Sequence, residues 1–236
     1  MIDKIQPSIT AALADVRDGA TVMIGGFGGA GQPTELIDGL IAQGAGELVI
    51  VNNNAGNGET GLAALLKAGR VRKIICSFPR QADSQVFDAL YRAGKIELEL
   101  VPQGTLAERI RAGGAGIPAF YTAAGVGTLL AEGKERKRFQ GRDFLLEHGL
   151  RADFALVKAD RADRYGNLTY TKTARNFGPI MCTAARITIA QAHRVVEPGD
   201  IDPECVVTPG IFVHRVVEIA HPAQESALVK EGRCYP

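Results

Sequence analysis

The sequence predicts an α/β fold in three layers: an open, mainly parallel sheet with helices on both faces. Short apolar runs alternate with stretches of helical periodicity through the first half of the 236 residues, which is the pattern of βαβ units. The second half has an irregular, glycine-rich middle and further strand patterns, which predict small antiparallel additions. Hydrophobic residues make up 46% and charged residues 22% of the chain, a globular composition that excludes wholesale disorder.

Apolar runs predict four strands in the first half, over residues 21–24, 48–51, 73–76 and 96–101. The second run is wholly apolar, as expected of a strand that is covered on both faces, whereas the fourth begins with strict alternation and is expected nearer an edge. Helical spacing of apolar residues predicts helices over 33–41, 61–68 and 84–93. Pro33 suits the first turn of its helix, because the amide hydrogen that it lacks has no partner there.

After Arg111 the pattern is less regular, and we expect mainly loop up to a hairpin turn at Gln140 and Gly141. The remaining elements are a turn over 164–167, a short helix over 177–185, and strands over 153–157, 186–190 and 211–217. We expect one domain over residues 1–221 and a flexible C-terminal tail over 222–236.

Charge and cysteine content exclude several classes of function. The net charge of +1 gives no electrostatic case for a nucleic-acid partner. No run of about 20 apolar residues predicts a membrane span, and the first ten residues lack the apolar core of a secretory signal. We therefore expect a cytoplasmic protein without a bound metal. Reduced thiols are expected, rather than a disulfide frame or a zinc site, at the widely spaced Cys76, Cys182, Cys205 and Cys234.

A glycine-rich loop follows the first predicted strand. Residues 26–31 match G-x-G-x-x-G between a strand and a helix, a pattern that binds dinucleotide phosphates at a helix N-terminus. A dinucleotide site also needs an acidic residue after the next strand, and asparagines stand there instead. Five glycines in seven residues exceed what one turn needs, so we expect close approach of a ligand. The loop consists of Gly25, Gly26, Phe27, Gly28, Gly29, Ala30 and Gly31.

Two further polar loops follow predicted strands at the same edge of the sheet. Asn52, Asn53 and Asn54 follow the second strand, and Gln103 and Gly104 follow the fourth. Ligands of open α/β sheets bind at the carboxyl ends of the strands, and neutral amides can donate hydrogen bonds to a developing oxyanion. Asparagine and glycine also simply build turns, so a structural role remains an alternative.

The loops do not supply a complete catalytic set. Glu59 is a tempting nucleophile, but the helix dipole alone favours a carboxylate in the first turn of a helix, so we expect a structural role. The four histidines are scattered, with no metal-ligand spacing and no evident serine or cysteine partner. The sequence therefore predicts loops that bind and polarise a substrate without a nucleophile to attack it.

Long motifs carry a resemblance to a known family. Residues 18–33, DGATVMIGGFGGAGQP, closely resemble the signature of the A subunits of family I 3-oxoacid CoA-transferases. The stretches 53–56, 102–113 and 172–177 are also similar to that family, and the resemblance runs from Asp18 to Val217.

The resemblance implies transfer of coenzyme A from succinyl-CoA to a 3-oxoacid, by a ping-pong reaction with no tightly bound cofactor. The nucleophile of the family is a glutamate in a Ser-Glu-Asn-Gly motif of the B subunit, which this sequence lacks. An A2B2 hetero-oligomer is therefore expected. By similarity, residues 25–31 contact CoA, and Asn53 and Gln103 donate hydrogen bonds to substrate oxygens beside that glutamate.

The sequence also bears on which 3-oxoacid accepts coenzyme A. Residues 76–84 look most like the family members that act on 3-oxoadipate, in the degradation of aromatic compounds, and Arg80 would give the remote carboxylate of that acid a bidentate partner. A surface arginine without such a role is the alternative, and acetoacetate remains a possible acceptor. Two other classes of function also stay open: an NAD-linked oxidoreductase and a non-catalytic binding module on this fold.

Overall fold

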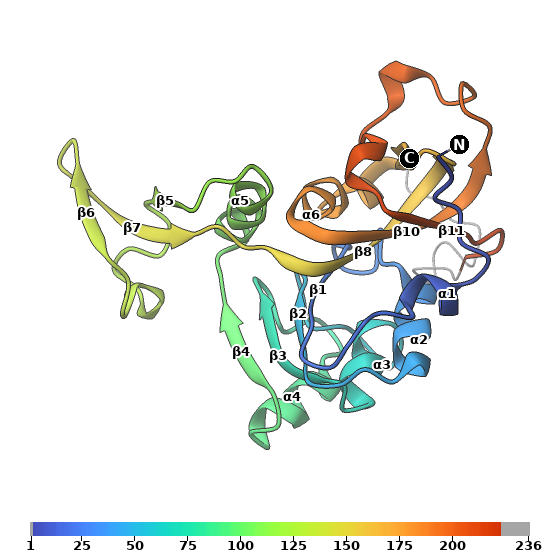
Figure 1. Ribbon diagram of the computed structural model, residues 1–236. Coiled ribbons are helices and arrows are strands. Elements are labelled where there is room, and N and C mark those ends of the chain that lie inside the picture. The colour runs from blue at the N-terminus through green and yellow to red at the C-terminus, as the bar shows by residue number, and fades with distance from the viewer. Residues whose placement is uncertain (1, 223–236) are drawn as a thin grey trace.

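The computed structural model describes residues 2–222 of the chain. Its main sheet has the strand order β11-β10-β8-β1-β2-β3-β4, with β9 paired to β8 (Figure 1). All pairs along that order are parallel, whereas β9 runs antiparallel to its neighbour. The predicted α/β fold with a mainly parallel sheet is therefore confirmed. The strands are β1 (Thr21–Ile24), β2 (Leu48–Val51), β3 (Val71–Cys76), β4 (Glu97–Leu100), β8 (Ala152–Asp163), β9 (Leu168–Thr169), β10 (Ala185–Val196) and β11 (Arg215–Glu218).

Helices cover the sheet in two groups, one on each face (Figure 1). The first group is α1 (Ile9–Leu13), α2 (Thr34–Gln43), α3 (Leu62–Lys67) and α4 (Gln85–Arg92), and the second is α5 (Gln103–Gly114) and α6 (Gly178–Ala184). Successive side chains of a strand point to opposite faces. Val22 and Ile24 of β1 accordingly pack with the first group, whereas Met23 packs with the second. Burial on both faces explains why this strand is a continuous apolar run.

The first half of the chain follows the prediction, apart from two helices that the prediction lacks. β4 lies at an edge of the sheet, as its alternating pattern indicated. α2 begins at Thr34, so Pro33 is the N-cap residue and does not lie in the first turn. The prediction lacks α1, and it places Gln103 and Gly104 in a loop although they are the first residues of α5.

α5 departs from the usual sequence pattern of a helix, because three of its twelve residues are glycine. Glycine is unfavourable in the interior of a helix. A Cβ atom on Gly113 would lie 2.1 Å from the carbonyl oxygen of Leu150, and one on Gly114 would lie 2.1 Å from Oγ1 of Thr183 in α6. These glycines allow α5 to approach its neighbours closely. Tertiary packing therefore outweighs local helix propensity here.

A three-stranded antiparallel sheet projects from the main sheet beside α5 (Figure 1). It consists of β5 (Ala119–Thr122), β6 (Arg136–Phe139) and β7 (Arg142–His148), and we call residues 119–148 the arm. The predicted hairpin is confirmed, since Gln140 and Gly141 have positive φ angles of 47° and 79°, as a tight turn between such strands requires. The expectation of loop is wrong for β5, which pairs with β7 along its length, and for the short 3-10 helix Leu129–Ala131.

The last third of the chain contains longer strands than expected. β8 and β10 have twelve residues each and pair with one another along most of their length. Ile211 and Phe212 belong to a 3-10 turn, not to the last strand, which begins at Arg215. Other 3-10 turns are Lys172–Arg175 and Pro203–Cys205. All of the expected tail except Pro222 lies outside the described residues, and the domain boundary at residue 221 stays a prediction.

Candidate active site

The carboxyl ends of β1, β2, β3 and β4 meet at one edge of the sheet, because these strands are parallel neighbours. The glycine loop, residues 25–31, follows β1 at this edge, and the asparagine loop, residues 52–61, follows β2. Residues 77–84 follow β3, and α5 begins shortly after β4. The sheet thus brings together the glycine loop, the asparagine loop and the first residues of α5, at the place where open α/β sheets bind ligands.

The glycine loop folds back on itself and is held by a distant asparagine. Phe27 and Ala30 exchange backbone hydrogen bonds of 3.0 and 3.1 Å. Asn176 accepts a 3.2 Å hydrogen bond from the N–H of Gly26 on Oδ1 and donates one of 2.9 Å to the Ala30 carbonyl through Nδ2. Gly31 has φ 73°, and a Cβ atom there would lie 2.3 Å from the carbonyl oxygen of Ala174. The tip of the loop is exposed, with Phe27 at 50%.

Two of the three asparagines after β2 build the loop. Asn52 is fully buried, and its Nδ2 donates a 2.6 Å hydrogen bond to the Ile24 carbonyl. Its Oδ1 accepts from the N–H of Asn54, whose own Oδ1 accepts from the N–H of Gly56, both at 2.8 Å. The turn-building alternative is therefore the observed role of Asn52 and Asn54.

Asn53 differs from its neighbours, because its side chain meets Gln103. Oδ1 of Asn53 accepts a 2.8 Å hydrogen bond from Nε2 of Gln103 and one of 2.7 Å from Oγ of Ser77. Asn53 is 3% exposed, whereas Gln103 is exposed. Nδ2 of Asn53 has no hydrogen-bond partner within residues 2–222, and Nε2 of Gln103 has a second hydrogen to donate. The pair can therefore present amide N–H groups to an oxygen atom of a ligand.

The sequence analysis missed Ser77 and the role of Asn176. Ser77 directly follows β3, so its position at the same edge of the sheet is the signal that could have identified it. The contact of Asn176 with the glycine loop spans 150 positions and has no local signal in the sequence.

Arg80 lies apart from the Asn53–Gln103 pair. Its Nε donates a 2.7 Å hydrogen bond to Oδ1 of Asp88, and its side chain is 59% exposed. No hydrogen bond joins Arg80 to Asn53 or Gln103 within the described part of the chain. The terminal Nη groups of this exposed side chain can bind a ligand.

Glu59, Cys76 and Cys182 are each paired or buried, and the exposed thiol of Cys205 lies in the 3-10 turn Pro203–Cys205, outside the loops that follow β1, β2, β3 and β4. Glu59 precedes α3 by three residues, so the expectation of a first-turn carboxylate is wrong. The Lys67 ammonium, 2.8 Å away, holds the pKa of the exposed Glu59 carboxyl below its usual value. Burial raises the pKa of the Cys76 and Cys182 thiols to about 12, which leaves them protonated and unreactive. Residues 2–222 contain no cluster of acidic, histidine or cysteine side chains suited to a metal, nor a helix long and apolar enough to cross a membrane.

Comparisons with known sequences identify the family of the chain. Residues 7–219 match the family model for coenzyme A transferase. The A subunit of the 3-oxoadipate CoA-transferase of Pseudomonas putida is 64% identical over 96% of this chain and 98% of that protein. The A subunit of a probable succinyl-CoA:3-ketoacid coenzyme A transferase of Bacillus subtilis is 50% identical over 91% of this chain and 89% of that protein.

Solved structures have the same fold at low sequence identity. Glutaconate coenzyme A-transferase from Acidaminococcus fermentans superimposes with a TM-score of 0.82 at 20% identity, over 94% of this chain and 78% of that one. An acyl-CoA transferase from E. coli O157:H7 also gives 0.82, at 22% identity, and this chain spans 48% of its length. The family match covers nearly the whole chain, and the structural matches share its sheet. The chain belongs to the coenzyme A transferase family.

Proposed function

We propose that this chain is the A subunit of an enzyme that transfers coenzyme A from succinyl-CoA to 3-oxoadipate. The observation that carries the proposal is the 64% identity, over nearly the full length, to the A subunits of the 3-oxoadipate CoA-transferases of Pseudomonas putida and Acinetobacter baylyi. The Asn53–Gln103 pair at the carboxyl edge of the sheet supports it, because CoA transfer passes through oxyanions that need hydrogen-bond donors.

A partner B subunit supplies the nucleophile in this proposal. Its glutamate carboxylate attacks the thioester carbonyl of succinyl-CoA and expels CoA thiolate, which forms a mixed anhydride. The thiolate then attacks the glutamyl carbonyl and releases succinate, which leaves a glutamyl-CoA thioester. The acceptor carboxylate takes up CoA by the same two steps in reverse. Nδ2 of Asn53 and Nε2 of Gln103 donate to the carbonyl oxygen, on which negative charge develops at each addition.

The glycine loop contacts CoA in this proposal, and its exposed tip supports that role. Asn176 and Asn54 hold the two sides of the loop, so backbone N–H groups near Gly28 and Gly29 keep fixed positions. A side chain on those residues would stand between the ligand and the backbone. The assembly in this proposal contains two A and two B subunits, in the cytoplasm.

Arg80 selects the acceptor by binding the remote carboxylate of 3-oxoadipate. Its Nε is held by Asp88, which orients the guanidinium and leaves the terminal nitrogens for a carboxylate. Acetoacetate has no such carboxylate. Arg80→Ala in the A–B complex should therefore lower kcat/KM for 3-oxoadipate about ten- to 150-fold, which corresponds to the ~1.5–3 kcal/mol of a hydrogen bond to a charged group. The same change should leave kcat/KM for acetoacetate unaffected.

The experiment measures kcat/KM of the reconstituted A–B complex with succinyl-CoA and each of the two acceptors. Arg92→Ala is the matched control, because Arg92 is an exposed arginine that also faces Asp88, at 4.0 Å. We expect wild type to prefer 3-oxoadipate and only the Arg80 variant to lose that preference. A wild-type preference for acetoacetate would instead assign the chain to the succinyl-CoA:3-ketoacid enzymes.

A further inference from the structure

A cavity of about 430 Å³ lies between the first turns of α5 and the strand β5 of the arm. Its walls include Gly104, Thr105 and Glu108 of α5, and Phe120, Tyr121 and Thr122 of the arm. Pro102 and Gly104, the two sequence neighbours of Gln103, both line the cavity, which therefore lies at the end of α5 that contributes to the candidate active site.

Thr105 is the unusual residue of this cavity. It is 3% exposed, and its Oγ1 has no hydrogen-bond partner among the described residues. Buried hydroxyls are nearly always hydrogen-bonded, and each exception calls for an explanation. Two χ1 rotamers are common for threonine in a helix, so one rotation can turn the hydroxyl toward a ligand. Thr105 is therefore a ready donor for a group that enters the cavity.

The N-terminus of α5 adds further unpaired donors. Its N-cap residue is Pro102, which has no polar side chain, and its first turn contains no acidic residue. Leu106 donates its N–H to the carbonyl of Pro102, but the N–H groups of Gln103, Gly104 and Thr105 have no acceptor within residues 2–222. Free N–H groups and the positive end of a helix together favour an anion.

Glu108 is the only acidic residue among the described walls of the cavity, and a cation offsets its charge. Arg111 donates two hydrogen bonds to its carboxylate, of 2.8 and 2.6 Å. The hydroxyl of Tyr121 donates its hydrogen bond to Glu135, which does not line the cavity, so this hydrogen is not available to a ligand there. The ring of Phe120 supplies an apolar wall. The site thus suits a short chain of methylene groups that ends in an anion.

We propose that this cavity binds the second carboxylate of succinate and of the succinyl group of succinyl-CoA. The inference rests on the proposed function and assigns a place to the far end of the CoA donor. Succinate holds its two carboxylates apart by only two methylene groups, so one can react beside Gln103 while the other lies close by. Thr105 is two residues further along α5, about 3 Å along the helix axis. In this proposal Arg80 binds the remote carboxylate of the longer 3-oxoadipate, and Thr105 binds that of the shorter succinate.

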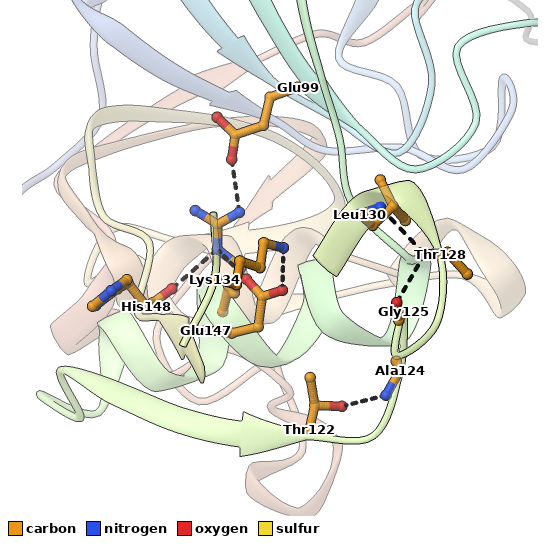
Figure 2. Close-up of polar contacts among 10 residues, drawn as sticks. Glu99, Thr122, Ala124, Gly125, Thr128, Leu130, Lys134, Glu147 and His148 are labelled. Atoms are coloured by element: carbon orange, nitrogen blue, oxygen red, sulfur yellow. Dashed lines mark hydrogen bonds and ion pairs between the residues drawn. The ribbon is translucent and has the colours of Figure 1, made fainter. Parts of the chain in front are cut away.

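The test measures binding of succinate and of butyrate to the A–B complex by calorimetry, for wild type and three variants. Butyrate has the same chain length but lacks the second carboxylate. Thr105→Val removes the hydroxyl at nearly constant shape. Thr128→Val is the matched control, because Thr128 does not line the cavity and its Oγ1 both donates to the Gly125 carbonyl at 2.8 Å and accepts the N–H of Leu130 at 3.2 Å (Figure 2). Glu108→Gln removes the opposing negative charge.

Thr105→Val should weaken succinate binding about tenfold or more, the effect of a lost hydrogen bond to a charged group, and leave butyrate binding unchanged. Thr128→Val should change the binding of neither acid, and Glu108→Gln should tighten the binding of succinate only. The melting temperature of the unliganded Thr105 variant should not fall, because the hydroxyl has no partner to lose. Equal losses for both acids, or no loss for succinate, would overturn the inference. Failure of the proposed function has a separate signature, the absence of CoA transfer by the wild-type complex.

Discussion

Asn53 is oriented before any substrate binds, because Ser77 and Gln103 both donate to its Oδ1. Its Nδ2 is thereby left as the group that can donate to a substrate.

Alanine at Asn53 or Gln103 should lower kcat by about 10²–10³, the usual cost of losing one oxyanion donor, with a smaller effect on KM. Steady-state kinetics of the A–B complex measures this. Asn57→Ala is the control, since Asn57 lies in the same loop but accepts the N–H of Asp83. A change confined to KM would make the pair simple binding groups.

Two glycines of the same loop should respond differently to substitution. Gly28 has φ 60° and open space where a Cβ would stand, whereas a Cβ on Gly31 would meet backbone at 2.3 Å. Gly28→Val should therefore give a folded chain that assembles but loses most turnover, through obstruction of CoA. Gly31→Ala should lower the stability of the folded chain, because the added Cβ would meet the backbone of Ala174 and no side-chain rotation can relieve that contact.

Thermal unfolding and kcat, measured together, separate the two cases. Normal kinetics in the Gly28 variant would contradict the proposed CoA contact. An unaltered melting temperature in the Gly31 variant would contradict the packing argument.

At the scale of elements, α5 connects the main sheet to the arm through one arginine. Arg109 donates a 2.8 Å hydrogen bond to Glu99 on β4 and one of 3.0 Å to the backbone carbonyl of His148 on β7. Beside it, Lys134 forms an ion pair with the buried Glu147, also on β7 (Figure 2). The hydrogen bond from Arg109 to His148 holds the arm against α5 and so fixes one wall of the Thr105 cavity, whereas the Lys134–Glu147 pair lies within the arm.

This connection gives a pH prediction. Burial raises the pKa of Glu99, but hydrogen bonds from Lys73 and Arg109 outweigh it and leave the pKa below its usual value. The charged carboxylate therefore stabilises the fold above the ordinary glutamate pKa of about 4.3, and this contribution is lost as the pH falls through the lower, folded-state pKa. Glu99→Gln should lower the melting temperature at pH 7 by about 2–4 °C, the shift that about 1 kcal/mol produces in a chain of this size.

The difference between Glu99→Gln and wild type should shrink as the pH falls below about 4.3, the value in unfolded chains. Glu97→Gln on the same strand is the control, because Glu97 is exposed and forms no ion pair within residues 2–222. Melting curves over this pH range measure both variants. A difference that is constant with pH would contradict the ion-pair account.

The elements that the sequence predicted are those with strong local patterns. β1, β2 and β3 are short apolar runs between helical stretches. The Gln140–Gly141 turn has positive φ angles at both residues, and glycine is a residue type that favours such a turn. β5 and α5 were not predictable locally. The pairing of β5 is set by β7 more than twenty positions later, and the glycines of α5 are explained only by the backbone and side chains that they approach.

In the candidate site too, some contacts could be predicted from the sequence and others depend on tertiary packing. Asn53 and Gln103 could be predicted to meet, because each follows a parallel strand at one edge of the sheet. The hydrogen bonds of Asn176 to the glycine loop and of Arg80 to Asp88 depend on how loops pack, and no spacing in the sequence specifies them.

At the scale of the whole molecule, the candidate site offers hydrogen-bond donors and a ligand loop, and no carboxylate or thiol is hydrogen-bonded to the Asn53–Gln103 pair within residues 2–222. Glu59 is paired with Lys67, and the thiols of Cys76 and Cys182 are buried and protonated. The central claim is therefore that the chain acts only together with a B subunit that carries the attacking glutamate.

The most direct test incubates succinyl-CoA with this chain alone, with only the B subunit, or with both, and then locates CoA thioesters by mass spectrometry after borohydride reduction or direct digestion. The account predicts that neither partner transfers CoA to a 3-oxoacid by itself, that the mixture does, and that the thioester lies on a glutamate of the B subunit. Transfer by this chain alone, or a thioester on its Glu59, would contradict the account.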